Sequence, residues 1–99
     1  EFYELVKMQP KELQEWLNTD ASKSVGDSDT EESTGHRSGR RIVQIKRTKK
    51  ADLQDDDYEH MVKVNAFIKR HTAQQPQGDV ENSNWRYSLK NWGHDPLKP

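Results

Sequence analysis

The sequence predicts an all-α domain, a compact array of four or five short helices with no sheet. Apolar residues recur every three or four positions in several segments, which is typical of one face of an amphipathic helix. No segment alternates apolar and polar residues as a half-buried strand does. The chain of 99 residues is long enough for a single domain spanning 1–99.

Two helices are expected at the N-terminal end. Residues 2–8 predict a short first helix, and Pro10 suits the first position of a second. Leucine and tryptophan then recur at helical spacing. This second helix is expected to end near Asn18 or Thr19, or at Gly26 if it continues.

The next segments are an acidic loop and a basic helix. Residues 27–34 lack apolar side chains and predict a mobile loop. Ser33 or Thr34 can cap the following helix, whose apolar face holds only two isoleucines and one valine. Gly35 and Gly39 lie one turn apart in it, which would let another backbone come close.

The strongest helix signal lies in the second half of the chain. Gln54 fits the N-cap, and the three aspartates that follow it oppose the helix dipole. Leu53 and Tyr58 stand at the two positions of a hydrophobic staple. The helix is expected to run to about Thr72 and to end in a basic turn.

A linker near 73–82, punctuated by proline and glycine, precedes the last helix. That helix begins after Ser83 or Asn84 and ends before Gly93, a residue type that commonly follows a helix. Residues 94–99 are expected to form an extended tail. The predicted core consists of Trp16, Ile42, Ile45, Met61, Val64, Ile68, Trp85, Leu89 and Trp92.

Composition excludes several classes of protein. Hydrophobic residues make up 29% of the chain and cysteine is absent, so the core is thin, and disulfides and cysteine metal sites are excluded. No apolar run approaches the length of a membrane span. Because there is neither a disulfide nor a signal peptide, we expect an intracellular monomer, cytoplasmic or nuclear, that binds no membrane and needs no cofactor.

Charge is distributed in blocks although the net charge is only −1. Residues 37–50 hold seven Lys or Arg and no acid, and such side chains can follow a phosphate backbone. The candidate contacts to nucleic acid or another anion are Lys23, Arg37, Arg40, Arg41, Lys46, Arg47, Lys49 and Lys50. The alternative interpretation is a solvated helix face, partly neutralised by the aspartates at 55–57.

Two further segments combine hydroxyl residues, glycine and cations: SKSVG at 22–26 and STGHRSGR at 33–40. Such segments can present backbone N–H groups to an anion at a helix N-terminus. The simpler interpretation, which we favour, is two ordinary helix caps.

Aromatic and histidine residues give weaker signals. Trp85 and Trp92 can stack unpaired bases, but they share an apolar helix face and are expected in the core, whereas Tyr87 lies off that face and is expected to be exposed. His60 and His71 lie about 16 Å apart along one helix and cannot bind the same ion, so no metal site is predicted. No nucleophile has a recognisable base at a fixed spacing, so we do not expect an enzyme.

A resemblance to a known family is carried by five segments: PKELQEWL, SKSVG, STGHRSGRRIVQI, DDDYEHMVKV and NWRYSLKNWGHDPLK. They resemble a family of small bacterial and fungal proteins classified as a domain of unknown function. The resemblance covers roughly residues 3–98 in the same order. Some members of that family are labelled DNA-binding, and the resemblance implies no catalytic residues.

Two functions follow as hypotheses. The first is a small nucleic-acid-associated domain that contacts the phosphate backbone of DNA with weak sequence preference, since Gln44 is the only uncharged side chain in the basic run suited to reading bases. The second is a protein-interaction module whose basic face binds an acidic protein. The first requires an exposed basic patch, and the second favours a large exposed apolar patch.

Overall fold

The computed structural model describes residues 1–25 and 34–98, and these ranges form the all-α fold that the sequence predicts. Its elements are α1 (Phe2–Leu5), α2 (Pro10–Leu17), α3 (Asp20–Ser24), α4 (Thr34–Arg47), the 3₁₀-helix η1 (Lys50–Asp52), α5 (Asp55–Thr72) and α6 (Asn84–Asn91). The described ranges contain no strand. The radius of gyration is 13.0 Å, as expected for a compact chain of about 100 residues.

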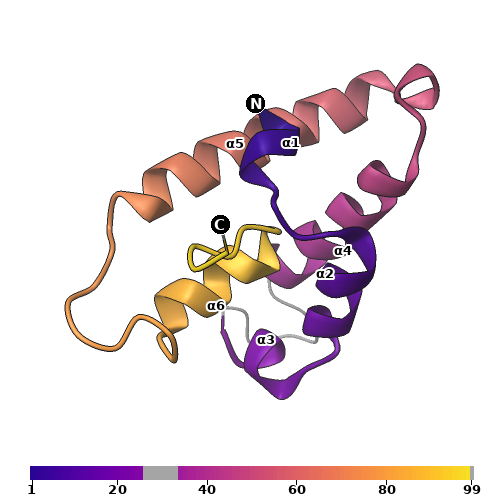
Figure 1. The fold of residues 1–99 in the computed structure, drawn as a ribbon. Coiled ribbons are helices and arrows are strands. Elements are labelled where there is room, and N and C mark those ends of the chain that lie inside the picture. The colour runs from indigo at the N-terminus through magenta and orange to yellow at the C-terminus, as the bar shows by residue number, and fades with distance from the viewer. Residues whose placement is uncertain (26–33, 99) are drawn as a thin grey trace.

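Helix α6 occupies the centre of the arrangement (Figure 1) and contacts α2, α3, α4 and α5. Helices α2 and α4 share the most extensive contact in the fold, and α1 packs against α5, the longest helix. The N-terminal helix therefore covers α5, while the C-terminal residues lie beside α6 and close to the α1–α2 connection (Figure 1).

The ends of α5 and α6 follow local sequence signals, as predicted. Helix α5 begins after Gln54, whose backbone N–H donates to Asp57 Oδ2 at 2.9 Å in a capping box. Helix α6 begins after Ser83, whose hydroxyl accepts the N–H of Arg86 at 3.1 Å. These caps satisfy N–H groups that no earlier turn of the helix can reach.

Helix α6 ends in a Schellman motif at Gly93, which has a φ of +80°. The N–H of Gly93 donates to the carbonyl of Lys90, and the N–H of His94 donates to that of Leu89. A side chain at position 93 would also meet Val6 Cγ1 at 2.6 Å. Glycine is therefore required here both for its backbone conformation and for the space it leaves.

Two thirds of the predicted core residues are buried, and the core also contains residues that were not predicted. Six predicted residues are buried: Ile42, Ile45, Met61, Val64, Ile68 and Leu89. The three predicted tryptophans are only partly buried and pack against the cluster from its edge. The cluster also contains Phe2, Val6, Met8, Leu13, Leu17 and Val43. The N-terminal segment thus supplies much of the apolar surface that a chain so poor in hydrophobic residues needs.

At the N-terminal end, the second helix ends at Leu17 with Asn18 as its C-cap, as predicted, whereas the first helix is shorter than expected. Helix α1 ends at Leu5 rather than near residue 8, because Met8 donates its N–H to the carbonyl of Gly93 instead of continuing a helix. The second helix does not run on toward Gly26. A new helix, α3, starts after Thr19, whose hydroxyl accepts the N–H of Ser22 at 3.1 Å.

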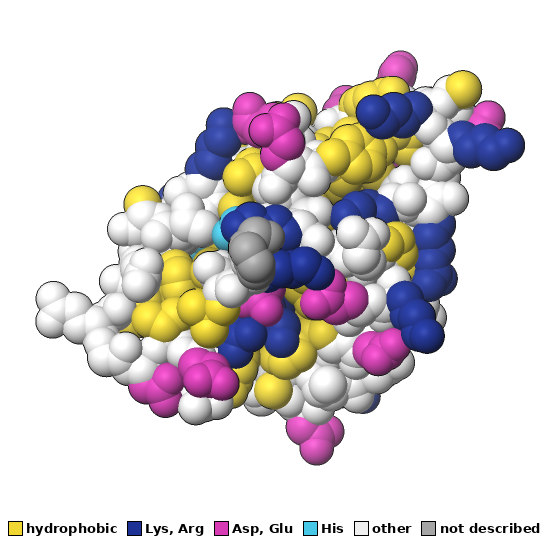
Figure 2. All heavy atoms as spheres, in the orientation of Figure 1, with side chains coloured by type: hydrophobic (Ala, Val, Ile, Leu, Met, Phe, Trp, Pro, Cys, Tyr) yellow, Lys and Arg dark blue, Asp and Glu magenta, His cyan; other side chains and the backbone are white. Residues whose placement is uncertain are grey.

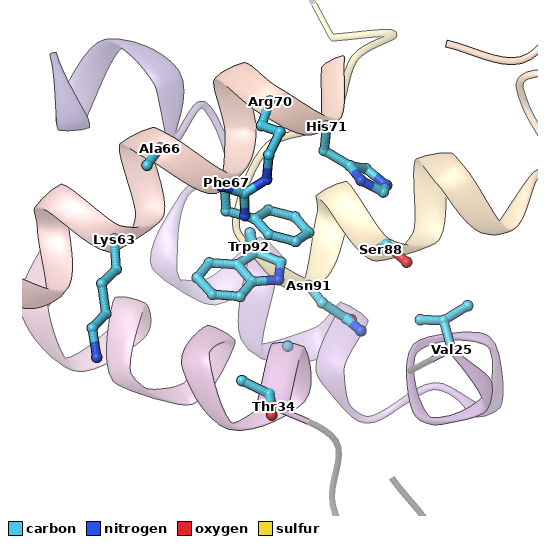
Figure 3. Close-up of a pocket in the computed structure, with 11 residues that line it drawn as sticks. Val25, Thr34, Lys63, Ala66, Phe67, Arg70, His71, Ser88, Asn91 and Trp92 are labelled. Carbon is cyan, nitrogen blue, oxygen red and sulfur yellow. The ribbon is translucent and has the colours of Figure 1, made fainter. Parts of the chain in front are cut away.

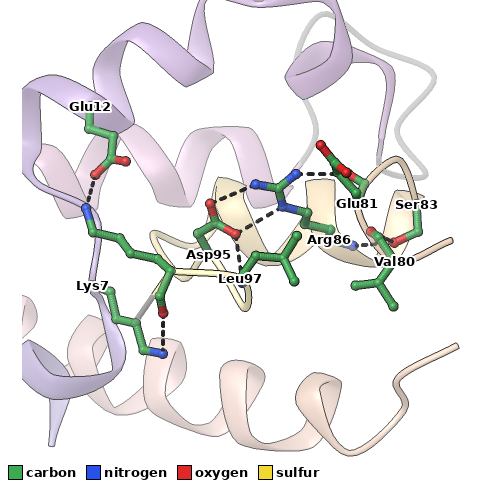
Figure 4. Close-up of polar contacts among 9 residues, drawn as sticks. Lys7, Glu12, Val80, Glu81, Ser83, Arg86, Asp95 and Leu97 are labelled. Carbon is green, nitrogen blue, oxygen red and sulfur yellow. Dashed lines mark hydrogen bonds and ion pairs between the residues drawn. The ribbon is translucent and has the colours of Figure 1, made fainter.

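The tail is folded back rather than extended, which corrects the prediction for 94–99 over its described part. Residues 96–97 form a turn closed by a bond from the N–H of Lys98 to the carbonyl of Asp95. The Arg86 guanidinium holds the Asp95 carboxylate through two bonds of 3.0 Å (Figure 4). Lys98 Nζ also lies 2.6 Å from Glu12 Oε1 on α2, so the tail joins α6 to α2.

Most of the predicted mobile loop at 27–34 lies outside the described residues, and only Thr34, the first residue of α4, is described. Across the described ranges, every helix is too short or too polar to cross a membrane.

Candidate functional site

Helix α4 presents a basic ridge to solvent. Arg37, Arg40, Gln44 and Arg47 are all exposed, and their spacing places them along one side of the helix. The opposite side is buried and carries the isoleucines and the valine of the core. We call these four residues the α4 ridge. Of the predicted outward face, Arg37, Arg40 and Arg47 are exposed, and the predicted inward isoleucines are buried.

Two of the predicted basic contacts serve the fold instead. Arg41 Nη2 lies 3.0 Å from Asp57 Oδ1 at the start of α5. Lys46 Nζ donates to the carbonyls of Val6 and Met8, both at 2.9 Å. Burial of its ammonium lowers the pKa of Lys46. These two cations stabilise helix junctions, so we leave them out of the candidate interface.

The other predicted cations are dispersed. Lys50 Nζ lies over the ring of Tyr3, 4.9 Å from its centroid. Lys49 is exposed just beyond the end of α4, and Lys23 is exposed on α3. On the face shown in Figure 2, Lys and Arg atoms are interspersed with Asp and Glu atoms rather than gathered into one field. Of the predicted cations, Arg37, Arg40 and Arg47 therefore share one exposed helix face, and Lys49 lies just beyond the end of that helix.

Two side-chain bridges join α4 to α5 before the helices separate. The first is the Arg41–Asp57 ion pair, and the second is a hydrogen bond of 2.9 Å between Ser38 Oγ and His60 Nε2. The separation of Ser38 Oγ and His60 Nε2 matches that between a catalytic nucleophile and its general base. Ser38, however, is only 4% exposed, so the bond works as a link between helices.

Beyond these bridges, toward the start of α4, the two helices enclose a cleft of about 590 Å³. The volume falls within the range of ligand pockets, roughly 300–1,000 Å³. Figure 3 shows α5 on one side, the first turn of α4 on the other and side chains of α6 between them. The lining residues are Val25, Thr34, Gly35, Lys63, Ala66, Phe67, Arg70, His71, Ser88, Asn91 and Trp92.

A series of nearly parallel rings forms one wall of the cleft. The Phe67 and Trp92 rings lie 4.2 Å apart, centroid to centroid, with 13° between their planes. His71 stacks on the other side of Phe67 at 5.0 Å, and His60 on the other side of Trp92 at 6.4 Å. The faces of Phe67 and Trp92 are therefore occupied by other rings, which leaves their edges to border the cleft.

Cations and unused hydrogen-bonding groups surround this wall. Among residues 1–25 and 34–98, no side chain that lines the cleft is acidic. Lys63 and Arg70 are exposed on its α5 side, and within the described ranges no ion pair or hydrogen bond occupies either cation. The indole N–H of Trp92 and the hydroxyl of Ser88 likewise have no hydrogen-bond partner among residues 1–25 and 34–98.

The other aromatic residues of α6 are committed to packing. Trp85 donates its indole N–H to the carbonyl of His71 at 2.7 Å. Tyr87, expected to be exposed, is partly buried and packs against Trp16 with 5.5 Å between ring centroids. Lys90 Nζ lies over Trp16 as well, 4.0 Å from its centroid. Of the predicted base-stacking set, only Trp92 borders the cleft.

Three side chains of the hydroxyl-rich segments, Ser22, His36 and Ser38, are hydrogen-bonded within the fold. Ser22 donates to Asn91 Oδ1, which also accepts the indole N–H of Trp16 at 2.8 Å. Ser38 is bound to His60, and His36 Nε2 lies 2.7 Å from the carbonyl of Leu17. The simpler interpretation, in which these residues serve helix ends and junctions, describes them better.

Burial lowers the pKa of three histidines, so their neutral forms are favoured. These are His60, His71 and His94. Positive neighbours contribute next for His60 and His71, through Arg41 and Arg70 respectively. No group of three His, Asp or Glu side chains in the described part of the chain is placed to hold a metal ion.

Sequence reasoning missed the cleft because its members come from three helices. Lys63, Phe67 and Arg70 stand at i, i+4 and i+7, which does predict a shared side of α5. Nothing in the sequence indicates that Ser88 of α6 and Trp92, its C-cap residue, lie opposite them. That placement depends on how α6 packs between α4 and α5.

Comparison with known proteins gives a family without an assigned function. A family described as "Protein of unknown function (DUF3140)" matches residues 1–90. No curated protein and no solved structure gives a significant match.

Proposed function

We propose that this chain, which belongs to the DUF3140 family of proteins of unknown function, is a nucleic-acid-associated domain that contacts the phosphate backbone through the α4 ridge. The observation that carries the proposal is the alignment of Arg37, Arg40 and Arg47 on the exposed side of one helix. The contact is expected to have weak sequence preference, because Gln44 is the only uncharged ridge residue suited to base readout. We propose no catalytic activity.

The geometry of the ridge suits a charged backbone. Arg37 and Arg47 are ten residues apart, which is about 15 Å along a helix, so the ridge can meet more than one phosphate. Arginine binds phosphate oxygens through two parallel hydrogen bonds and keeps its charge at any physiological pH. Helix α4 contains no Asp or Glu between Thr34 and Arg47, so no acid on the helix itself repels a polyanion.

Acidic side chains at the start of α5 face α4. Asp56 and Asp57 lie 3.8 Å and 3.0 Å from the guanidinium of Arg41. Their charge is therefore opposed by a cation that belongs to α4 but is not part of the ridge. This arrangement reduces the repulsion that the aspartates would otherwise exert on a phosphate at Arg40.

The test is a titration of ¹⁵N-labelled protein with a mixed-sequence DNA duplex at two salt concentrations. Shifts should centre on the α4 ridge and weaken as salt rises. If three phosphates are neutralised, the logarithm of the affinity should fall against the logarithm of salt with a slope of about −0.9 × 3. The double variant Arg40→Glu/Arg47→Glu should abolish binding.

The matched control is Lys11→Glu/Lys69→Glu, which changes the net charge by the same amount away from the ridge. Both control residues are exposed, on α2 and α5. Binding should survive in the control, although weakened by the altered net charge. Equal loss in the two double variants, or no shifts for the unmodified protein at low salt, would overturn the proposal and favour an acidic protein as the partner.

A further inference from the structure

We propose that the cleft between α4, α5 and α6 binds a nucleoside phosphate, either free or as an unpaired nucleotide at the end of a strand. Lys63 and Arg70 would hold the phosphate, and the indole N–H of Trp92 would donate to an acceptor of the base. The inference deepens the proposed nucleic-acid contact and rests on it for the choice of a nucleotide over other organic anions. The cleft itself is separate from the α4 ridge.

The cleft carries positive charge on its α5 side. Within the part of the chain that the structure describes, two cations and no acid line the cleft. Lys63 and Arg70 are exposed and, within the described ranges, have no internal partner. Figure 3 shows both side chains leaving α5 on the side of the cleft, with Lys63 extending toward α4 and Arg70 lying beside Phe67. An anionic group is therefore the ligand part that this rim favours.

The cleft also borders hydrogen-bonding groups that have no partner within the described ranges. In this protein, the indole N–H groups of Trp16 and Trp85 both donate to protein oxygens. The N–H of Trp92 is the exception among the three tryptophans in the described ranges. Buried or half-buried indoles usually donate their N–H, so a donor left over at a cleft indicates an acceptor from a ligand.

The remaining lining of the cleft combines apolar side chains with a few polar groups. Val25, Ala66 and the edge of Phe67 give the cleft apolar contacts, and Ser88 adds a hydroxyl that can both donate and accept. A nucleobase offers a flat apolar body with acceptors on its rim, which suits a site built of ring edges and a few polar groups. The volume of about 590 Å³ is sufficient for one nucleotide.

The position of the cleft links it to the ridge. Thr34 and Gly35, at the first turn of α4, line the cleft, and the ridge begins at Arg37 in the next turn. A strand that lies along the ridge would bring its end nucleotide toward this opening. The phosphate of that nucleotide would then meet Lys63 and Arg70 from α5.

The closing experiment follows the indole N–H signals of ¹⁵N-labelled protein during titration with adenosine monophosphate. The Trp92 signal should shift, while that of Trp16, which is bonded to Asn91, should move little. Lys63→Gln/Arg70→Gln should weaken binding about tenfold or more, since each replacement removes a charge-assisted hydrogen bond. Ala66→Trp should block the cleft without changing its charge.

The controls separate this inference from the proposed function. Lys69→Gln alters the residue next to Arg70 that instead pairs with Glu1, and it should leave nucleotide binding unchanged. Arg40→Glu/Arg47→Glu should abolish duplex binding yet keep the Trp92 shift. A 5′-phosphorylated single strand that competes with the monophosphate would identify the strand end as the source. Free nucleotide alone moving Trp92 would identify the monomer as the source.

Three results would overturn the inference. One is an unmoved Trp92 signal at millimolar nucleotide, with duplex binding intact. Another is equal binding of inorganic phosphate and the nucleotide, which would leave no role for the base. The third is unchanged nucleotide affinity in Ala66→Trp once its fold has been verified by its indole spectrum.

Discussion

Gly39 of α4 packs directly against the backbone carbonyl of Asn91 in α6. A Cβ atom at position 39 would lie 2.4 Å from that oxygen and 2.7 Å from Leu17 Cδ2 on α2. The absence of a side chain here lets three helices meet at one point. The sequence-based expectation that a backbone approaches the Gly35–Gly39 side of α4 is thereby confirmed at Gly39.

Gly39→Ala is expected to destabilise the domain by about 1–3 kcal/mol, the range for overpacked cores. Alanine alone would favour the helix by about 1 kcal/mol, but the Asn91 carbonyl cannot move without shifting α6. Urea unfolding followed by tryptophan fluorescence measures the change. Gln44→Ala, on the exposed side of the same helix, should alter stability by less than about 0.5 kcal/mol. An alanine variant as stable as the native protein would contradict the packing described.

Asn91→Ala is expected to be among the most destabilising single changes in α6. The Asn91 amide accepts from Trp16 Nε1 and Ser22 Oγ, and donates to the carbonyl of Ser22 at 3.1 Å. Each buried group left without a partner costs about 1–3 kcal/mol.

The measurements for Asn91→Ala are the unfolding free energy and the Trp16 indole N–H shift, which should move toward that of a solvated indole. Asn84→Ala, at an exposed position of the same helix, provides the control. If both variants unfold at the same urea concentration, the amide does not organise this junction.

The Arg86–Asp95 pair should stabilise the fold in a manner that depends on pH. Burial alone raises the pKa of Asp95, but the Arg86 guanidinium and the N–H of Leu97 outweigh it and hold the pKa below its usual value. A carboxyl with a lowered pKa stabilises the folded state above its unfolded pKa of about 3.9. That contribution is lost as pH falls through the folded pKa.

Asp95→Asn is therefore expected to cost about 1–3 kcal/mol near neutral pH, with the difference from the native protein shrinking below about pH 4. Urea unfolding at several pH values measures this difference. A constant difference across the acidic range would mean that the Asp95 charge has no part in the effect.

The histidines with lowered pKa values predict a second loss of stability, which sets in at a less acidic pH than that of Asp95. Burial lowers the pKa of His60, His71 and His94 in the folded chain. The unfolded chain takes up protons near its usual histidine pKa of about 6.5. Stability should therefore be full above that value and fall as pH drops from there through the folded pKa values.

Thermal unfolding between about pH 7 and pH 5, with ¹H NMR titration of the imidazole signals, checks this prediction. The three assigned histidines should titrate below about 6.5, and the melting temperature should fall over the same interval. If one of these imidazoles titrated above the unfolded value of about 6.5, protonating it would stabilise the folded state, which is the opposite of the effect expected.

The start of α5 and the end of α6 could be predicted from the sequence because they depend on residues that are near neighbours in the chain. Gln54 and Asp57 form a reciprocal cap over three positions, and Gly93 closes α6 through bonds that reach back five residues at most. Such contacts form whenever the local backbone is helical. The α4 ridge is equally local, since helical periodicity alone places Arg37, Arg40 and Arg47 on one side.

The roles of the other cations could not be read in this way. Lys46 binds the carbonyl of Val6, forty positions away in the sequence, and it therefore leaves the interface that its charge predicts. The tail expected to be extended is folded because His94 Nδ1 reaches the carbonyl of Leu5, 89 positions away. A hydrogen bond between such distant residues depends on how the helices pack, and no periodicity encodes it.

By itself, the sequence determined that this protein is helical, where its main helices begin and end, and that α4 carries an outward basic face. The tertiary structure alone decided which charges remain at the surface, that Trp92 borders a cleft rather than filling the core, and that Lys63 and Arg70 stand beside it. The reason is how far apart in the sequence the interacting residues lie. Caps and amphipathic faces arise from neighbours in the chain, whereas a cleft arises where helices separate, and that separation is set by the packing of every side chain between them.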